Sequence, residues 1–532
     1  MSFLLNLFKR KPVAPERVPT DEVIPLHHLD DTSVNRAICL YFSMRFDDVL
    51  DPDKLVGALE KLLERPGWRK LGARLRLNEH KKLEYHVPQK YSPARPAVQY
   101  THASHHIPIS EHPLGSKMPK ATSKLSISGA LEPFRELFWP QSKPLKLADW
   151  LYSDRPQLQL HIVSFSDTTL VTLTWLHTLL DAMGRNMLLR CWSAMLEGRE
   201  DDIPEFYGYD FDPLASLGAP KTSTESKPTA DDDESEHVSL EQEPGEEPYV
   251  LQDKVLTGWS FFSFVIRFIW DLTVHRAEHS RILCIPASFL SSLRRSALSD
   301  LSTVHPSTLV LNTSDPANPT PFLSDGDILA AWWLRTLVPS QPWASTASPN
   351  KTIHFMNVFG MRDILTSTSP QLLPKGVAYI SNCVSAIHTL FTYSDILTKP
   401  LGLLAAQIRI DLTQQSTRAQ VEAQVRLSRK SIAKSNRPPI YGTGDMQMST
   451  VSNWSKGKMY ETDFKAAVVG GHENKSRRGK PSFVQADGLA DGFSVRNSGC
   501  VLGRDGEGNY WVTAVLRPVV WEGVERAIRS MA

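Results

Sequence analysis

Cysteine is scarce in this chain of 532 residues, and the few cysteines form no pattern. An odd number of them, scattered without any Cys-x-x-Cys spacing, excludes a disulfide framework and a thiolate zinc site. We therefore expect unpaired, buried thiols and a reducing, cytoplasmic location. The five residues are Cys39, Cys191, Cys284, Cys383 and Cys500.

The chain also lacks an excess of charge of either sign. Its 59 Lys and Arg residues nearly balance its 58 Asp and Glu residues, which leaves a formal net charge of +1. Binding to a polyanion needs a basic excess, because the phosphate backbone supplies most of the affinity. The composition therefore gives no electrostatic ground for a nucleic acid partner.

Long hydrophobic runs are missing as well. The apolar run at residues 3–8 precedes its basic residues, the reverse of a secretory signal, and we expect residues 1–22 to form a flexible tail. The most apolar stretch, residues 259–272, is short for a membrane span and is broken by Arg267 and Asp271. It predicts a helix crossing between domains, with Arg267 and Asp271 paired one turn apart. The alternative is a helix docked peripherally on an internal membrane.

The rest of the composition is that of an ordinary globular protein, with 41% hydrophobic and 22% charged residues, and the length favours two domains. Residues 219–256 contain a Ser/Thr/Pro-rich segment, acidic clusters and little apolar surface to offset the entropy of ordering. We interpret them as a disordered acidic linker. It separates an N-terminal lobe at residues 23–218 from a C-terminal lobe at residues 257–532.

Local patterns predict both helices and strands. Asp51-Pro52 and Ser324-Asp325 are typical of helix starts, since each places a capping side chain before an apolar periodic segment. Residues 71–77 and 82–87 indicate a pair of strands, and residues 351–359 indicate another strand. The chain is therefore predicted to have a mixed α/β architecture.

One junction between such elements carries a candidate catalytic pair. Residues 171–175 alternate as a half-buried strand does, apolar residues recur at helical spacing after Gly184, and His177 and Asp181 lie between. A junction of this kind can turn the imidazole toward a cavity and the carboxylate back into the fold, which suits a general base. The same spacing at residues 27–31 lies in a polar segment, and we predict no site there.

Other catalytic motifs are absent from the sequence. It has no Gly-x-Ser-x-Gly elbow and no Gly-x-x-x-x-Gly-Lys-Ser/Thr loop, so neither covalent catalysis nor a phosphate loop has a visible candidate. Several histidines lack metal-ligand spacing with carboxylates or thiols, and we expect core or surface roles and no metal. These are His105, His106, His161, His354 and His388.

Seven short segments in a fixed order give a more specific signal. They are residues 24–26, 55–63 and 72–76, the His-x-x-x-Asp signature at 177–184, and residues 324–325, 357–362 and 379–382. Along most of its length the chain thereby resembles the BAHD-type acyl-CoA-dependent acyltransferases, particularly the fungal members linked to secondary metabolism.

The resemblance implies an α/β fold of two similar lobes with mixed sheets, of the chloramphenicol acetyltransferase-like type, that meet around a tunnel. It implies that His177 is the general base and that Asp181 is structural and pairs with Arg362. The implied enzyme is a monomeric O-acyltransferase with acyl-CoA as co-substrate and no bound cofactor. The expected acyl group is acetyl, and the expected acceptor is a hydroxyl of a small terpenoid or polyketide.

Near the C-terminus the chain departs from the family pattern. Asp463-Phe464 begins the second signature, Asp-Phe-Gly-Trp-Gly, but its glycines and tryptophan are lost, and Gly479-Lys480-Pro481 follows only after an insertion. We predict that basic residues of this segment contact the ribose phosphate of CoA at the tunnel mouth, with an exposed basic loop as the alternative. They are Lys475, Arg477, Arg478 and Lys480.

Two other functions stay open at this point. Loss of the second signature fits a catalytically inactive binding or scaffold protein with the same fold. N-acyl or condensation-type transfer from a carrier protein is the other alternative, although condensation enzymes carry a doubled histidine where this chain has Leu176.

Overall fold

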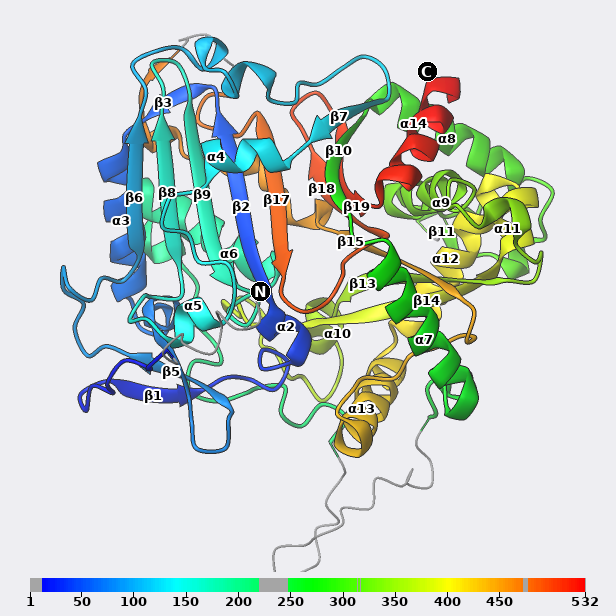
Figure 1. Ribbon diagram of the computed structural model, residues 1–532, viewed down its shortest axis with the longest axis horizontal. Coiled ribbons are helices and arrows are strands. Elements are labelled where there is room, and N and C mark those ends of the chain that lie inside the picture. The colour runs from blue at the N-terminus through cyan, green and yellow to red at the C-terminus, as the bar shows by residue number, and fades with distance from the viewer. Residues whose placement is uncertain (1–11, 220–246, 313, 316, 472–476, 532) are drawn as a thin grey trace, which may run out of the picture.

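Two lobes, each built on its own sheet, make up the molecule (Figure 1). The computed structural model describes residues 12–219, 247–312, 314–315, 317–471 and 477–531. We call the lobe around the five-stranded sheet the N-lobe and the lobe around the seven-stranded sheet the C-lobe. The predicted mixed α/β fold with two lobes is confirmed, because each sheet contains both parallel and antiparallel pairs.

The N-lobe sheet has the strand order β17-β2-β9-β8-β6. Two helices, α3 and α6, pack against each other beside it, and Trp192 of α6 donates its indole N–H to the Leu55 carbonyl oxygen of α3 at 2.9 Å. A three-stranded sheet, β1-β5-β4, adjoins it. The bounds are β1 Glu22–Pro25, β2 Ile38–Phe46, β4 Arg74–Leu77, β5 Leu83–Val87, β6 Gln99–Ser104, β8 Gln159–Ser164, β9 Thr169–Leu176, β17 Phe483–Ala490, α3 Pro52–Glu64 and α6 Ala182–Leu196.

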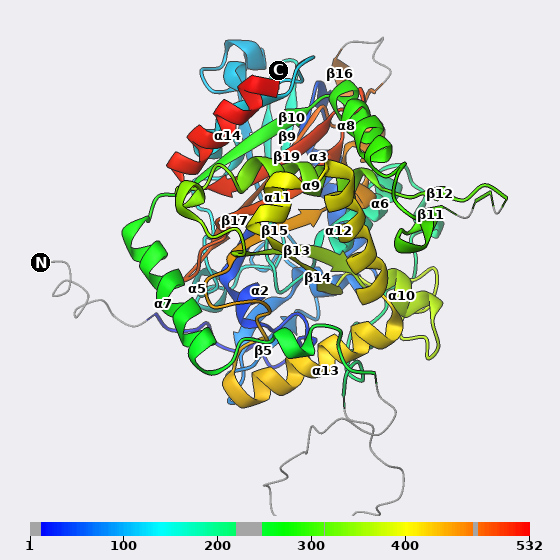
Figure 2. The ribbon, with the colours of Figure 1, turned by 90° about the vertical axis from the view of Figure 1, so that its right-hand side faces the viewer.

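The C-lobe sheet has the order β14-β13-β15-β18-β19-β10-β7, and helices α8, α9, α12 and α14 lie on its outer side (Figure 2). The strand bounds are β7 Ser126–Ala130, β10 His279–Ile285, β13 Thr352–Gly360, β14 Val384–Thr392, β15 Gln447–Asn453, β18 Ser498–Arg504 and β19 Tyr510–Leu516. The helix bounds are α8 Ala287–Asp300, α9 Asp325–Leu337, α12 Leu401–Gln415 and α14 Pro518–Met531.

Shorter elements complete the described chain. The helices are α2 Ser33–Ala37, α4 Arg135–Phe138, α5 Ala148–Leu151, α7 Gly258–Val274, α10 Arg362–Ser367, α11 Tyr393–Thr398 and α13 Arg418–Ser435. The strands form two small sheets, β3 Asp48–Leu50 with β16 Val468–Gly471, and β11 Leu311–Asn312 with β12 Thr320–Pro321.

Both predicted helix starts are confirmed. Asp51 caps α3 by accepting hydrogen bonds from the backbone N–H groups of Asp53 and Lys54, and Ser324 forms a capping box with Asp327 at the start of α9. The predicted strand pair is β4 with β5, in antiparallel register. In these cases the local side-chain chemistry was enough to predict the element.

The lobes do not follow the two continuous ranges drawn from the sequence. Strand β7 comes from the N-terminal half but pairs with β10 in the C-lobe sheet. Strand β17 comes from the C-terminal half but pairs with β2 along its whole length in the N-lobe sheet. Each of the two large sheets therefore contains one strand supplied by the other half of the chain, and β16 also comes from the C-terminal half to pair with β3.

The predicted linker at residues 219–256 is only partly within the described residues, and its last part is ordered. Tyr249 is buried, and its hydroxyl donates to the Gln415 side-chain oxygen at 2.9 Å, while the Val250 N–H donates to Gln420. The prediction of disorder is wrong for residues 247–256, because these few aromatic and apolar side chains pack on α12 and α13. Residues 220–246 lie outside the described residues, as do residues 1–11 of the predicted tail.

Helix α7 occupies the apolar stretch at residues 259–272, but it lies along the outside of the C-lobe (Figures 1 and 2). The predicted pair of Arg267 with Asp271 does not form. Asp271 is instead paired with Arg517 at 2.8 Å and with Arg496 at 2.5 Å, because both arginines reach it from the C-lobe. Within the described chain, no helix is both long and apolar enough to cross a membrane.

The five cysteines carry no disulfide, and four of them are buried, as expected. Two of the histidines assigned to the core, His354 on β13 and His388 on β14, form a hydrogen-bonded pair at 2.9 Å. Burial lowers the pKa of His354 to about 4, and burial together with His354 lowers the pKa of His388 to about 3.

This pair predicts acid sensitivity of the fold. Both histidines have a folded-state pKa below the unfolded value near 6.5, so their stabilisation is complete above that pH and is lost as the pH falls toward 4. We expect the free energy of unfolding to decrease by about 2 kcal/mol per histidine between pH 7.5 and pH 5. Urea unfolding at the two pH values measures this decrease.

The double variant H354Q/H388Q should show a smaller decrease over the same pH interval, whatever its stability at pH 7.5. The matched control is H80Q, since His80 has a side chain that is 78% exposed. If H354Q/H388Q kept the full pH dependence of the unmodified protein, the assignment to this pair would be wrong.

Candidate active site

His177 lies directly after β9, where the chain leaves the N-lobe sheet and turns into α6. Its backbone N–H donates to the Ile38 carbonyl oxygen on β2 at 2.9 Å, which anchors the turn to the neighbouring strand. The side chain is half-buried and faces a cavity of about 420 Å³. The junction predicted from the strand and helix patterns therefore presents its imidazole to an internal space.

Both lobes line this cavity, which holds ligand-sized volume. Most of its surface is apolar, and three charged side chains, Asp181, Arg185 and Asp487, reach it together with His177. The apolar and hydroxyl-bearing lining includes Ile38, Leu40, Trp175, Val358, Val384, Thr450, Ser452, Trp454, Ser498 and Val515.

The environment of His177 favours the neutral imidazole. Burial is the main cause that lowers its pKa below the ordinary value, and the guanidinium of Arg185 acts in the same direction. The residue's own carbonyl group, Asp181 and Asn382 offset part of this effect. At neutral pH the ring is therefore unprotonated and able to accept a proton.

Asp181 is the N-cap of α6 and points away from the imidazole into the interface between the lobes. Its carboxylate accepts hydrogen bonds from the backbone N–H groups of Met183 and Gly184 at 3.0 and 2.8 Å, and of Cys383 at 3.0 Å. Arg362 binds the same carboxylate through both terminal nitrogens, at 2.8 and 2.9 Å. The structure thus contains the pair of Asp181 with Arg362 that the resemblance implies.

These contacts explain the electrostatics of the pair. Burial alone would raise the pKa of Asp181, but Arg362, first among the compensating groups, holds it below the usual range. Arg362 also donates to the carbonyl oxygens of Tyr379 and Ser381 at 3.2 and 2.6 Å. Both oxygens of the Asp181 carboxylate accept hydrogen bonds from Arg362 and from backbone N–H groups, so Asp181 is not available to orient His177.

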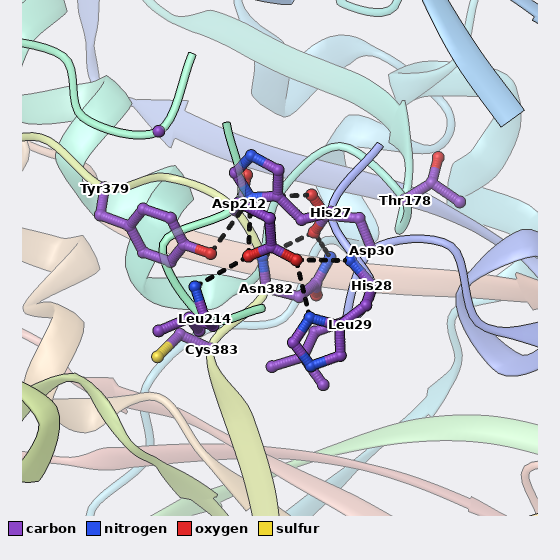
Figure 3. Close-up of polar contacts among 12 residues, drawn as sticks. His27, His28, Leu29, Asp30, Thr178, Asp212, Leu214, Tyr379, Asn382 and Cys383 are labelled. Carbon is purple, nitrogen blue, oxygen red and sulfur yellow. Dashed lines mark hydrogen bonds and ion pairs between the residues drawn. The ribbon is translucent and has the colours of Figure 1, made fainter. Parts of the chain in front are cut away.

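A buried polar cluster behind the turn was missed from the sequence (Figure 3). Asp30 is completely buried, and one of its oxygens accepts hydrogen bonds from both the backbone and side-chain nitrogens of Asn382, each at 2.8 Å. The same Asn382 side-chain nitrogen donates to the carbonyl oxygen of His177 at 2.8 Å. Asp30 therefore holds the backbone of the catalytic turn through Asn382.

The sequence places residues 27–31 in a polar segment, but the structure buries part of it; that no catalytic site lies there stays a prediction. His27 is buried, stacks on Tyr379 with the ring centroids 5.9 Å apart, and lies 3.4 Å from the Nζ of Lys70. Burial lowers the pKa of His27 to about 3 and raises the pKa of Asp30 to about 6, and burial also lowers the pKa of Lys70. The sequence could not indicate this cluster, because nothing in the pattern around Lys70 shows that it lies beside His27 in the folded chain.

The second signature is packed into the core of the N-lobe although its glycines are lost. Phe464 is buried and stacks on Phe46, and its backbone N–H donates to the Gly479 carbonyl oxygen at 2.8 Å. Gly479 has a φ of +74°, and a Cβ atom there would lie 2.4 Å from the Lys465 Cα. The Gly-Lys-Pro segment therefore lies beside Asp463-Phe464, and part of the insertion forms β16.

Two of the four basic residues of this segment are engaged by an acidic side chain. Arg477 and Lys480 both pair with Glu461, at 3.0 and 2.7 Å. Arg478 is half-buried, and Lys475 lies outside the described residues. Contact of these side chains with CoA stays a prediction, and it requires Glu461 to give up its partners to a phosphate.

In the described part of the chain no group of three His, Cys, Asp or Glu side chains is arranged to hold a metal ion. Two lobes with mixed sheets, a shared cavity and a histidine at its wall define a two-lobed acyltransferase of the chloramphenicol acetyltransferase-like type. The crystal structure of F. sporotrichioides TRI101 complexed with Coenzyme A and T-2 has this fold. The aligned region covers 95% of this chain and 97% of the TRI101 chain, with a TM-score of 0.61 and a sequence identity of 14%.

Comparison with curated proteins is more specific than the fold. The chain is 35% identical to acetyltransferase adrJ of Penicillium rubens over 98% of both chains. It is 39% identical to transcriptional regulator calD of Penicillium decumbens over 99% of both. No family model matches the sequence. The chain belongs to the family of fungal acyl-CoA-dependent acyltransferases of secondary metabolism.

The geometry predicts strong coupling between Asp181 and Arg362. Replacing either partner leaves the other charge buried and unpaired, which costs about 3 to 5 kcal/mol of folding free energy. We expect both D181A and R362M to lose that amount in urea unfolding, and the double variant D181A/R362M to lose clearly less than the sum. The control is E197Q, which breaks an exposed pair with Arg199 and should cost at most about 1 kcal/mol. Additive losses would contradict a direct interaction.

Proposed function

We propose that this protein transfers an acetyl group from acetyl-CoA to a hydroxyl group of a small secondary metabolite, with His177 as the general base. The observation that carries the proposal is a neutral, half-buried imidazole on the wall of a cavity shared by both lobes. The names of curated relatives support acetyl transfer, and the TRI101 complex supports a site for CoA beside a hydroxylated acceptor.

The proposed reaction moves one proton and one acyl group. His177 takes the proton of the acceptor hydroxyl while the oxygen attacks the thioester carbonyl carbon. The tetrahedral intermediate collapses as its carbon–sulfur bond breaks, and the CoA thiolate leaves and takes up the proton from His177. In this proposal the acyl group and the acceptor hydroxyl meet in the cavity beside His177, so proximity replaces a covalent enzyme intermediate.

Asp181 contributes by position rather than by proton transfer. Its carboxylate caps α6 and binds Arg362 of the other lobe, and Asn382 holds the His177 carbonyl oxygen. Together these contacts fix the turn that carries the imidazole. They are positioning residues in this proposal, and His177 alone touches the reacting atoms.

Three alternatives are separated by experiment. An inactive binding or regulatory protein is suggested by the names of calD and of transcriptional regulator sdnM of Sordaria araneosa, which is 33% identical over 99% of this chain. The second alternative is acyl transfer to an amine, which differs from the proposed reaction only in the acceptor. The third is transfer from a carrier protein, which differs in the donor, and the protein should then show no activity with free acyl-CoA.

The test of the proposal is the variant H177A. We expect kcat/KM with acetyl-CoA and a hydroxylated terpenoid or polyketide to fall by about 10³-fold, measured as release of free thiol. The free energy of unfolding should change by less than about 1 kcal/mol, since the ring makes few packing contacts on its cavity side.

The matched control is H102A, because His102 lies on the edge strand β6, where it contacts Ser164 and the ring of Tyr100, and is not among the residues that line the cavity. Turnover by H177A near that of H102A would contradict the mechanism. If the unmodified protein released no thiol with any pair of acceptor and donor, the inactive alternative would be favoured. If the acyl group were found on an amine, the acceptor named in the proposal would be wrong.

We also propose that α7 docks on the surface of an anionic membrane. Its outer face exposes large apolar side chains, with Trp259 78% and Trp270 69% exposed, and further residues at helical spacing: Phe262, Ile266, Ile269 and Val274. Tryptophan side chains favour the interfacial layer of a bilayer, where an apolar ring and a polar N–H are both satisfied.

Charge complementarity selects this partner. The exposed charged groups of α7 and its C-terminal end are Arg267 and Arg276, whereas Asp271 is engaged by Arg496 and Arg517. Arg437, which follows α13, lies over the ring of Phe261 at 3.3 Å and adds a further cation beside the helix. An apolar face bordered by cations suits a bilayer that contains anionic lipid.

Sedimentation with vesicles tests this proposal. We expect binding to phosphatidylcholine vesicles that contain phosphatidylserine, weaker binding without phosphatidylserine, and at least about a tenfold loss for W259S/W270S. The control L397S/V519S removes two exposed apolar side chains elsewhere on the surface. Equal binding of the two double variants would overturn the proposal, as would a dimer in solution that only W259S/W270S abolishes.

A further inference from the structure

The cavity contains a cation that the proposed reaction does not use. Arg185 lies one helical turn after Asp181 on α6, its side chain is only 1% exposed, and it lines the same cavity as His177. Burial lowers the pKa of Arg185 to about 9, so the guanidinium still carries its charge at neutral pH.

Within the described residues Arg185 forms no ion pair, and Asp181, which attracts it, is already bound by Arg362. Its surroundings are aromatic, with the guanidinium carbon 3.8 Å from the ring centroid of Phe42, 4.3 Å from that of Trp454 and 6.0 Å from that of Trp175. Within the described chain, Nε and Nη2 are buried without a hydrogen-bond partner. The rings offset part of the desolvation cost but supply no acceptor for the N–H groups.

The other charges at the cavity wall are already balanced. Asp181 is neutralised by Arg362, and Asp487 is bound by Arg135 through two hydrogen bonds at 2.6 and 3.0 Å. His177 is neutral at pH 7 because burial lowers its pKa. Among the described residues that line the cavity, Arg185 is therefore the charged side chain without an ion-pair partner of its own.

We propose that Arg185 binds a carboxylate carried by a ligand inside this cavity, which makes it an anion subsite beside the reacting atoms. An unpaired buried charge destabilises the protein, and a ligand that neutralises this charge removes the destabilisation on binding. The proposal rests on the proposed function, because the cavity is taken as the site of acyl transfer.

The chemistry of the subsite favours a carboxylate over a phosphate. One guanidinium balances one negative charge, whereas a phosphate dianion needs several cations and the cavity wall offers no second unpaired one in the described chain. A planar guanidinium held between two rings presents its N–H groups in one plane, which suits a planar carboxylate. Hydroxyl groups of Thr450, Ser452 and Ser498 line the same cavity.

Such a carboxylate has two chemical sources. It is either part of the acceptor, which is then a hydroxy acid, or the free end of a dicarboxylic acyl group on CoA. The experiment has one arm for each source, the acceptor and the acyl group. Both arms compare the unmodified protein with R185Q and R185K.

The acceptor arm uses decanoate as the probe and decanol as its neutral counterpart, with thermal unfolding as the readout. We expect decanoate to raise the Tm of the unmodified protein and of H177A, and to bind R185Q at least about tenfold more weakly, since a charge-assisted hydrogen bond is lost. R185K should retain part of the effect. Decanol should act equally on the unmodified protein and R185Q.

The acyl arm compares succinyl-CoA with acetyl-CoA by titration calorimetry, with no turnover needed. A preference of the unmodified protein for succinyl-CoA that R185Q loses supports the subsite and assigns it to the acyl group. Loss of the decanoate effect in R185Q with no succinyl-CoA preference supports it and assigns it to the acceptor.

A structural role of the guanidinium predicts different results. If neither arm distinguishes R185Q from the unmodified protein, or if ligand-free R185Q unfolds with a loss as large as that of D181A, the proposal is overturned. Because binding is measured in H177A as well, failure of the catalytic mechanism leaves these outcomes unaffected and remains distinguishable from failure of the subsite.

Discussion

A single carboxylate joins the two lobes and fixes the geometry of the cavity between them. Asp181 caps α6 of the N-lobe, while Arg362 begins α10 directly after β13 of the C-lobe. Since the bidentate pair is buried, it resists screening by salt and tolerates little displacement. The turn that carries His177 lies between the strand and the cap, so this contact fixes the end of the turn where α6 begins.

A second set of polar contacts supports the same turn. The chain from Asp30 through Asn382 to the His177 carbonyl oxygen is buried, and every link is a hydrogen bond of 2.8 Å. Buried networks of this kind specify one arrangement because a partly satisfied alternative leaves costly unpaired groups. The active turn is thus held by backbone contacts, which leaves its imidazole ring free to face substrates.

Local chemistry made much of this predictable. The caps at Asp51 and Ser324 and the strand-to-helix junction at His177 could be found from neighbouring residues alone. The lobe boundaries could not, because β7 and β17 pair with strands far away in the sequence. Nor could the cluster at Asp30 be found, since a buried lysine and a buried aspartate look like surface residues until tertiary structure places them together.

The strands exchanged between the lobes have a consequence for how the molecule is assembled. Neither sheet can be completed until the chain has been synthesised almost to its end, because β17 closes the edge beside β2 of the N-lobe. The N-lobe therefore leaves the ribosome with an open edge, and the two halves acquire their native form as one cooperative unit. A gene fragment encoding one lobe is not a minimal domain, and recombination between relatives must preserve both exchanged strands.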